Sequence, residues 1–181
     1  MRYIGCSNFA AWQVVKALAV AEKYGLHRYV VYQGYYSLLG RDYEWELSPM
    51  AQDQGLGLMI WSPLGWGRLT GKIKRGEASA SGRIREGGAS GGPDVDEELM
   101  YNVLDVLHQI AEDTGKSVAQ VAINWLMQKD SVCNVIIGAR DEKQLIENIG
   151  SVGWNLSPEY VLQLDEISVQ KPLYPHWVGM R

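Results

Sequence analysis

The sequence has few of the residues that mark metal-binding or disulfide-bonded proteins. It contains two cysteines and three histidines among 181 residues, and the cysteines do not have the spacing of metal ligands. Because Cys6 and Cys133 lie in or beside apolar segments, we expect both to be free, buried thiols. This cysteine usage predicts a cytoplasmic protein without a metal site.

Excess positive charge and long apolar runs are also missing. Lysine and arginine number 17 against 21 acidic residues, a net charge of -4, which disfavours nucleic acid or an anionic membrane as a partner. No apolar run has the length that a bilayer span requires. The first residues do not resemble a signal peptide.

Phenylalanine is nearly absent, whereas other aromatic residues are abundant. One phenylalanine stands against seven tryptophans and ten tyrosines. Tryptophan and tyrosine combine an apolar ring with a polar group and are common around wet pockets, so this is a weak indication of a ligand site. The length suits a single domain, residues 1–181.

Short apolar runs alternate with helical patterns along the chain. Strands are predicted at 2–6, 29–33, 58–61 and 132–137. Helices are predicted over 10–24, 41–54 and 97–114, with three more beginning near 117, 141 and 157. This alternation predicts an α/β fold of parallel strands with right-handed crossovers.

Two of these helices carry residues that we expect to face the core. In the first, the apolar positions include Trp12, Val15 and Leu18. In the helix that begins near 141, Leu145 and Ile149 are expected to face inward.

The third strand leads into the most informative stretch, residues 58–72. Its uninterrupted apolar run predicts a strand buried on both faces. Pro63 ends the strand, and Gly65 and Gly67 give the backbone freedom to turn. Trp61 could stack on a flat ring, and Lys72 could meet an anion. A core strand with an ordinary glycine and proline turn is the alternative.

Residues 76–94 break the composition, because they are rich in glycine and serine and poor in large apolar residues. This composition predicts a mobile loop, either over a binding site or between domains. Four predicted strands end in polar or glycine-rich residues, at 7–8, 33–36, 61–62 and 138–140. In a parallel sheet these ends lie at one rim, where ligands bind.

In this order, four stretches closely resemble the aldo-keto reductase family. They are Gly-Cys-Ser-Asn-Phe from residue 5, Gln-Gly-Tyr-Tyr-Ser-Leu-Leu from residue 33, Trp-Ser-Pro-Leu with Gly-Arg-Leu-Thr-Gly-Lys in 61–72, and Gly-Ala-Arg with Gln-Leu-Ile-Glu-Asn in 138–148. The resemblance runs from about residue 3 to 177. It implies a parallel (β/α) half of a TIM (β/α)8 barrel, its last four strands, and NADP(H) as the cofactor.

The resemblance also implies a set of cofactor-binding residues. Ser7, Asn8 and Gln33 would bind the nicotinamide carboxamide, and Trp61 would stack on the nicotinamide ring. The remaining positions would hold the pyrophosphate, the 2′-phosphate and the adenosine: Ser62, Pro63, Leu64, Gly67, Lys72, Gly138, Arg140, Gln144, Glu147 and Asn148.

Each of these residues has a plain structural alternative. Ser7 and Asn8 could cap a helix, Glu147 could be a solvated helix residue, and Arg140 could pair with a surface carboxylate. Their joint occurrence at corresponding places in one family argues against coincidence.

The family's catalytic tetrad of Asp, Tyr, Lys and His lies on its first four strands, which this sequence does not match. His27, His108 and His176 lack the family's flanking residues, so no catalytic residue is assigned. Four strands cannot close a barrel, and their unpaired edges predict self-association.

The expected activity is therefore that of an NADP(H)-dependent oxidoreductase. It would reduce small aldehydes or ketones to alcohols by hydride transfer, with this chain providing the cofactor-binding half as a truncated barrel. A non-catalytic nucleotide-binding or regulatory subunit, or an inactive remnant, are the alternatives.

Overall fold

The computed structural model describes residues 1–73, 75 and 92–178. The strands are β1 (Ile4–Ser7), β2 (Tyr29–Tyr35), β3 (Gly57–Trp61) and β4 (Val132–Val135). They form one parallel sheet in the order β1-β2-β3-β4, which confirms the predicted α/β architecture. Most of the predicted loop 76–94 lies outside the described residues.

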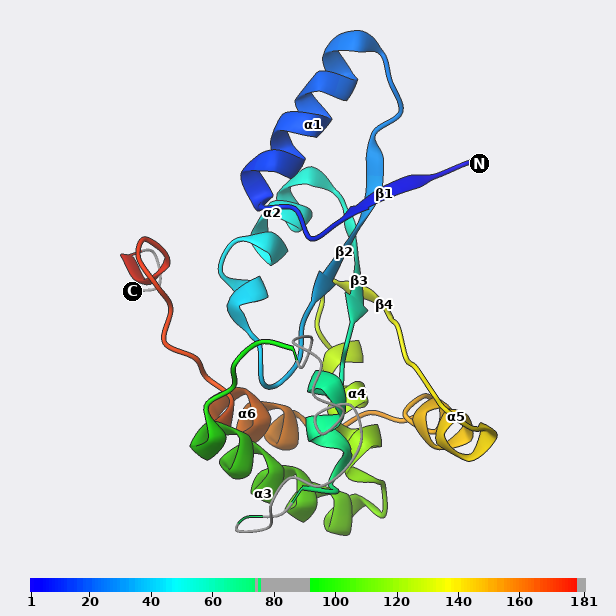
Figure 1. Ribbon diagram of the computed structural model, residues 1–181, viewed down its shortest axis with the longest axis vertical. Coiled ribbons are helices and arrows are strands. Elements are labelled where there is room, and N and C mark those ends of the chain that lie inside the picture. The colour runs from blue at the N-terminus through cyan, green and yellow to red at the C-terminus, as the bar shows by residue number, and fades with distance from the viewer. Residues whose placement is uncertain (74, 76–91, 179–181) are drawn as a thin grey trace.

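The helices are α1 (Ala11–Tyr24), α2 (Leu47–Gln54), α3 (Glu97–Thr114), α4 (Val118–Met127), α5 (Glu142–Ile149) and α6 (Pro158–Ile167). Short 3-10 turns cover Asp42–Glu44, Gly65–Thr70 and His176–Val178. In Figure 1, α1 and α2 lie along the upper part of the sheet, and α3, α4 and α6 gather below its carboxyl ends. The helix α5 stands apart on the side of β4.

Capping residues set several helix ends where the sequence predicts them. The Ser117 hydroxyl accepts from the Gln120 amide while the Gln120 side chain accepts from the Ser117 amide, a complete capping box for α4. Asp141 caps α5, and Ser157 precedes Pro158 at the first turn of α6. These contacts satisfy amides that the helices leave unpaired.

One predicted helix is wrong in its first half. Residues 41–54 form a 3-10 turn and then α2, because Tyr43 turns into the core and the Arg41 guanidinium bonds to Asp165 and Ser168 at the end of α6. A continuous helix through this segment is therefore not formed.

The two faces of the sheet differ in burial. Cys6, Tyr32 and Leu58 are in register and point into the core on one face, and Ile60 continues this buried row one step further. On the other face Met59 and Trp61 are half-buried. The prediction that β3 is buried on both faces is therefore wrong, because the described helices cover only one of them.

Burial of side chains also departs from expectation at both flanks of the sheet. On α1 the buried residues include Val14 and Leu18, whereas Trp12 is 61% exposed. On α5, Leu145 and Ile149 are exposed. Cys6 is buried as expected, but Cys133 is exposed. These side chains lie at the outer strands β1 and β4, where no further strand pairs within the described residues.

Candidate functional site

The open face of the sheet carries polar residues near the carboxyl ends of the strands. Ser7, Gln33 and Met59 are direct neighbours in register across β1, β2 and β3, so their side chains lie in one row. All three are half-buried, and the Gln33 amide donates to the Met59 sulfur at 3.5 Å. The row presents an amide and a hydroxyl at this face.

Asn8 joins this row to the ring of Trp61. Its backbone amide donates to the Gln33 carbonyl at 3.3 Å, and its side-chain oxygen accepts from the Trp61 indole N–H at 3.2 Å. Asn8 has a φ of 59°, a left-handed conformation that asparagine tolerates better than most residues. The structure therefore brings Ser7, Asn8, Gln33 and Trp61 into one cluster, as the resemblance predicts.

Neither Ser7 nor Asn8 caps the following helix. The N-cap of α1 is Ala10, and its amide donates to the Gln13 side chain at 2.9 Å. The capping alternative for Ser7 and Asn8 is therefore wrong, because neither residue is the N-cap of α1.

Two aromatic residues that the sequence did not single out complete the cluster. Tyr35 is the register neighbour of Trp61, with ring centroids 5.3 Å apart. Trp66 lies 5.2 Å from the Tyr35 ring and 5.5 Å from the Trp61 ring. Both lie within stretches that the sequence marks, 33–36 and 58–72, but neither residue was assigned a role there.

The turn after β3 has an unusual backbone. Ser62 and Trp66 have φ values of 52° and 60°, which is strained for residues other than glycine. Gly67 has a φ of 91°, and an added Cβ there would have no atom within 4 Å, so its outer side is open. Its amide already donates to the Leu64 carbonyl at 3.0 Å, so Gly67 offers space to a ligand and not a donor.

The flanks of this turn are Pro63, which is buried, and Lys72, which is exposed. Within the described residues Lys72 forms no ion pair.

The second group of predicted residues lies at the start of α5. The Gln144 side-chain oxygen accepts from the Arg140 amide at 3.1 Å, and the Asn148 amide donates to the Gly138 carbonyl at 3.2 Å. These two side chains therefore shape the 138–140 loop. Glu147 is exposed, which fits a solvated residue as well as a ligand contact.

Room for a ligand exists along this loop. An added Cβ at Gly138 would have no atom within 4 Å. Arg140 is exposed and pairs with no carboxylate among the described residues, so the alternative of a surface ion pair is not observed there. In the described part of the chain no hydrogen bond connects this loop to Ser7, Gln33 or Trp61, so the two groups are held separately.

The aromatic cluster holds no acid with a pKa near neutrality. Burial raises the pKa of Tyr35, although its hydrogen bond with Ser37 and the nearby Arg68 act in the opposite direction. Its hydroxyl therefore stays protonated at neutral pH.

Within the described residues no group of three or more His, Cys, Asp or Glu could hold a metal ion. None of the described helices has both the length and the apolar character to cross a membrane.

Comparison with known proteins places these features in context. The model of the aldo/keto reductase family matches residues 1–169. An uncharacterized oxidoreductase YrpG from Bacillus subtilis (strain 168) is 36% identical over 165 residues, which cover 91% of this chain and 48% of that protein. Versiconal hemiacetal acetate reductase from Aspergillus parasiticus is 33% identical over 178 residues, 96% of this chain and 50% of that protein.

A third relative has a name of a different kind. A probable voltage-gated potassium channel subunit beta from Oryza sativa subsp. japonica is 35% identical over 176 residues, 94% of this chain and 53% of that protein. The chain spans about half the length of each of these three relatives.

Proposed function

Because the chain belongs to the aldo/keto reductase family, we propose that it carries the NADP(H)-binding half of an oxidoreductase that reduces aldehydes or ketones to alcohols. The observation that carries this proposal is the cluster of Ser7, Asn8 and Gln33 beside the Trp61 ring. Amide and hydroxyl groups next to a flat indole suit an aromatic ring that bears a carboxamide. When bound, the nicotinamide would supply the hydride.

The residues of the cluster have separate parts in this proposal. Ser7 and Gln33 would hydrogen-bond the carboxamide. Asn8 would do so through its side-chain nitrogen, since its oxygen holds the Trp61 indole at 3.2 Å. Trp61 would stack on one face of the nicotinamide, so the hydride would be exchanged on the other.

The open backbone positions fit the rest of the dinucleotide. Gly67 and Gly138 both leave space where a Cβ would stand, so a ligand can approach the chain there. Ser62, Pro63, Leu64, Gly67 and Lys72 would surround the pyrophosphate.

The loop before α5 would receive the other end of the cofactor. We propose that Arg140 binds a 2′-phosphate, which favours NADP(H) over NAD(H). Gln144, Glu147 and Asn148 would face the adenosine, with Gln144 and Asn148 also keeping the 138–140 loop in shape.

We assign no catalytic residue. Reduction of a carbonyl needs a proton donor at its oxygen while the hydride reaches its carbon. His27, His108 and His176 lie on the loop before β2, on α3 and after α6, and among the described residues none of them forms a hydrogen bond or ring contact with Trp61. The donor would come from strands equivalent to the first half of the family barrel, so activity is proposed for the whole protein and not for this chain by itself.

A nucleotide-binding regulatory subunit is the second candidate. It is favoured by two relatives whose names describe potassium channel beta subunits, at 35% and 34% identity. An inactive remnant is the third. A longer reading frame that encodes Asp, Tyr, Lys and His in family context would favour the enzyme over the regulatory subunit. Nucleotide binding would favour either of these two functions over an inactive remnant.

We also propose that copies of the chain associate through their sheet edges. Strands β1 and β4 are the outer strands of the described sheet, and exposed apolar residues lie near both, Trp12 and Leu26 near β1 and Ile136 directly after β4. Light scattering should show a dimer or larger species, and a stable monomer would contradict this.

The two free cysteines support a cytoplasmic location.

Fluorescence titration with NADPH on the purified chain tests the cofactor site. Trp61→Ala should raise the Kd about tenfold or more, since aromatic stacking on a base contributes about 1–3 kcal/mol. Arg140→Ala should weaken NADPH about tenfold and leave NADH unchanged, because it removes a charge-assisted bond to the 2′-phosphate.

Trp12→Ala is the matched control for the first variant, because Trp12 is 61% exposed on α1. A folded chain that binds no NADPH would refute the proposed function.

A further inference from the structure

Tyr35 has a position that the cofactor-binding residues do not explain. It is the last residue of β2, and its ring lies 5.3 Å from Trp61 and 5.2 Å from Trp66. The ring also lies against Gly40, where an added Cβ would be 2.3 Å from Tyr35 Cε1. Tyr35 therefore contacts both tryptophan rings and the backbone of the turn that follows β2.

The turn behind Tyr35 is tightly closed. Ser37 and Gly40 exchange two backbone hydrogen bonds, of 3.2 and 3.0 Å. The Ser37 hydroxyl, fully buried, lies 2.9 Å from the Tyr35 hydroxyl and accepts from the Leu39 amide at 3.2 Å. The turn thus fixes both the face and the hydroxyl of Tyr35.

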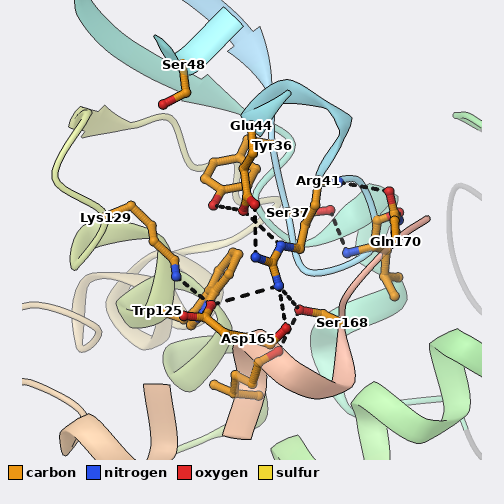
Figure 2. A network of polar contacts seen from close by, with 12 residues as sticks. Tyr36, Ser37, Arg41, Glu44, Ser48, Trp125, Lys129, Asp165, Ser168 and Gln170 are labelled. Carbon is orange, nitrogen blue, oxygen red and sulfur yellow. Dashed lines mark hydrogen bonds and ion pairs between the residues drawn. The ribbon is translucent and has the colours of Figure 1, made fainter. Parts of the chain in front are cut away.

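A second set of contacts fixes the turn to the C-terminal part of the chain (Figure 2). The Gln170 side chain donates to the Leu39 carbonyl at 3.0 Å and accepts from the Arg41 amide at 3.1 Å. The Arg41 guanidinium donates to the Asp165 carbonyl at 2.6 Å and to the Ser168 hydroxyl at 2.9 Å. We call these contacts of Arg41 and Gln170 the α6 latch.

Trp61 needs such support if it is to act as a stacking platform. It is half-buried on the open face of the sheet, and its indole N–H is held only by the exposed Asn8 among the described residues. An indole free to change rotamer would have to be ordered each time a ring binds, which would weaken binding by about two- to tenfold. Contacts with Tyr35 and Trp66 limit that freedom before binding.

We propose that Tyr35 is a positioning residue for the cofactor ring, which holds Trp61 in its stacking orientation and is itself held by the α6 latch. The inference rests on the proposed function, since it concerns the same nicotinamide site. It assigns a function to the last turn of α6 and to Gln170, neither of which touches the cofactor cluster.

The test compares two ligands on the same chain. NADPH reaches Trp61 in the proposed site, whereas adenosine 2′,5′-bisphosphate represents only the other end of the cofactor. Tyr35→Leu should raise the Kd of NADPH about fivefold, and Tyr35→Phe, which keeps the ring, should restore most of the affinity. Gln170→Leu, which opens the latch without touching Tyr35, should raise it about threefold. The Kd of adenosine 2′,5′-bisphosphate should not change in any of these variants.

Lys129→Met is the control for a general loss of stability. Lys129 pairs with Asp165 in the same network but does not contact the turn, so this variant should melt at a lower temperature and keep both Kd values. Changes of less than about twofold for Tyr35→Leu, or equal weakening of both ligands, would overturn the inference. If the original chain binds neither ligand, the proposed function fails together with it.

A measurement on the free protein tests the variants whose affinity for NADPH is too low to titrate. In the free protein, Tyr35→Leu should increase quenching of tryptophan fluorescence by acrylamide, and the increase should disappear in a Trp61→Phe background. Equal increases in both backgrounds would show that Tyr35 does not hold Trp61, and would also overturn the inference.

Discussion

Replacement of Arg41 by methionine should strongly destabilise the chain. The Arg41 side chain is 12% exposed, and its guanidinium forms a two-bond pair with Glu44 at 2.8 and 2.9 Å in addition to the latch contacts. It also lies over the Trp125 ring at 5.6 Å. Methionine keeps the apolar length of the side chain and removes every polar contact of the guanidinium, whereas the backbone amide of residue 41 can still donate to Gln170.

The magnitude follows from what each partner loses. Glu44 would keep only the Tyr36 hydroxyl as a donor among the described residues, whereas Asp165 would still accept from Trp125 and Lys129. Breaking one side of a buried ion pair costs about 3–5 kcal/mol. The Glu44 side chain is 31% exposed and can regain some water, so we expect a loss near the lower end, about 3 kcal/mol.

Urea unfolding followed by circular dichroism measures this loss, and a double-mutant cycle with Glu44→Gln identifies its origin. Because Glu44→Gln removes the stranded charge, the double variant should be more stable than the sum of the single effects predicts, by about 1–3 kcal/mol. Arg41→Lys, which keeps the charge and loses the planar fork, should fall between the original chain and Arg41→Met. A loss below about 1 kcal/mol, or strict additivity with Glu44→Gln, would refute the reasoning.

Three further predictions concern other parts of the chain. Gly138→Ala should leave the melting temperature unchanged, because an added Cβ meets no atom within 4 Å, yet should weaken NADPH binding in a titration. Unchanged binding would contradict the proposed approach of the ligand to this glycine. Iodoacetamide at pH 8 should modify exposed Cys133 before Cys6, because burial hides the Cys6 thiol and raises its pKa. Mass spectrometry of the peptides measures the order of modification, and faster modification of Cys6 would contradict the prediction. Burial, with a smaller contribution from Cys6, raises the pKa of Tyr32 from its ordinary value near 10 to about 12. The unfolded chain therefore releases this proton at lower pH than the folded chain, and the free energy of unfolding should fall from pH 10 to 12, less so in Tyr32→Phe.

Local signals in the sequence were sufficient for most of the fold. Apolar runs that end in polar or glycine residues located β1 to β4, and the pattern of Ser117 with Gln120 located the start of α4. These features depend on neighbours within a few residues. The same kind of reasoning placed Asn8 and Trp61 together, because parallel strands end at one rim.

The errors arise where burial depends on distant parts of the chain. Leu145 and Ile149 form an apolar stripe on α5 that the sequence shows plainly, but no element among the described residues covers it. Residues 41–46 depart from a helix because Arg41 finds partners on α6, more than a hundred residues away. Tyr35 and Trp66 were missed because an aromatic residue at the end of a strand or in the following turn has the same local sequence pattern whether it fills a core or lines a site.

The strained backbone gives an independent argument that the rim is a binding site. Asn8, Ser62 and Trp66 are the described residues other than glycine that have positive φ values, and they follow β1 and β3 at the carboxyl edge of the sheet. Left-handed backbone costs about 1–2 kcal/mol per residue with a side chain, and glycine would relieve it. Two of these side chains contact Trp61 directly, Asn8 through its hydrogen bond and Trp66 through its ring. A glycine at either position would lose that contact, so the strain is consistent with selection for the orientation of Trp61 and not for stability.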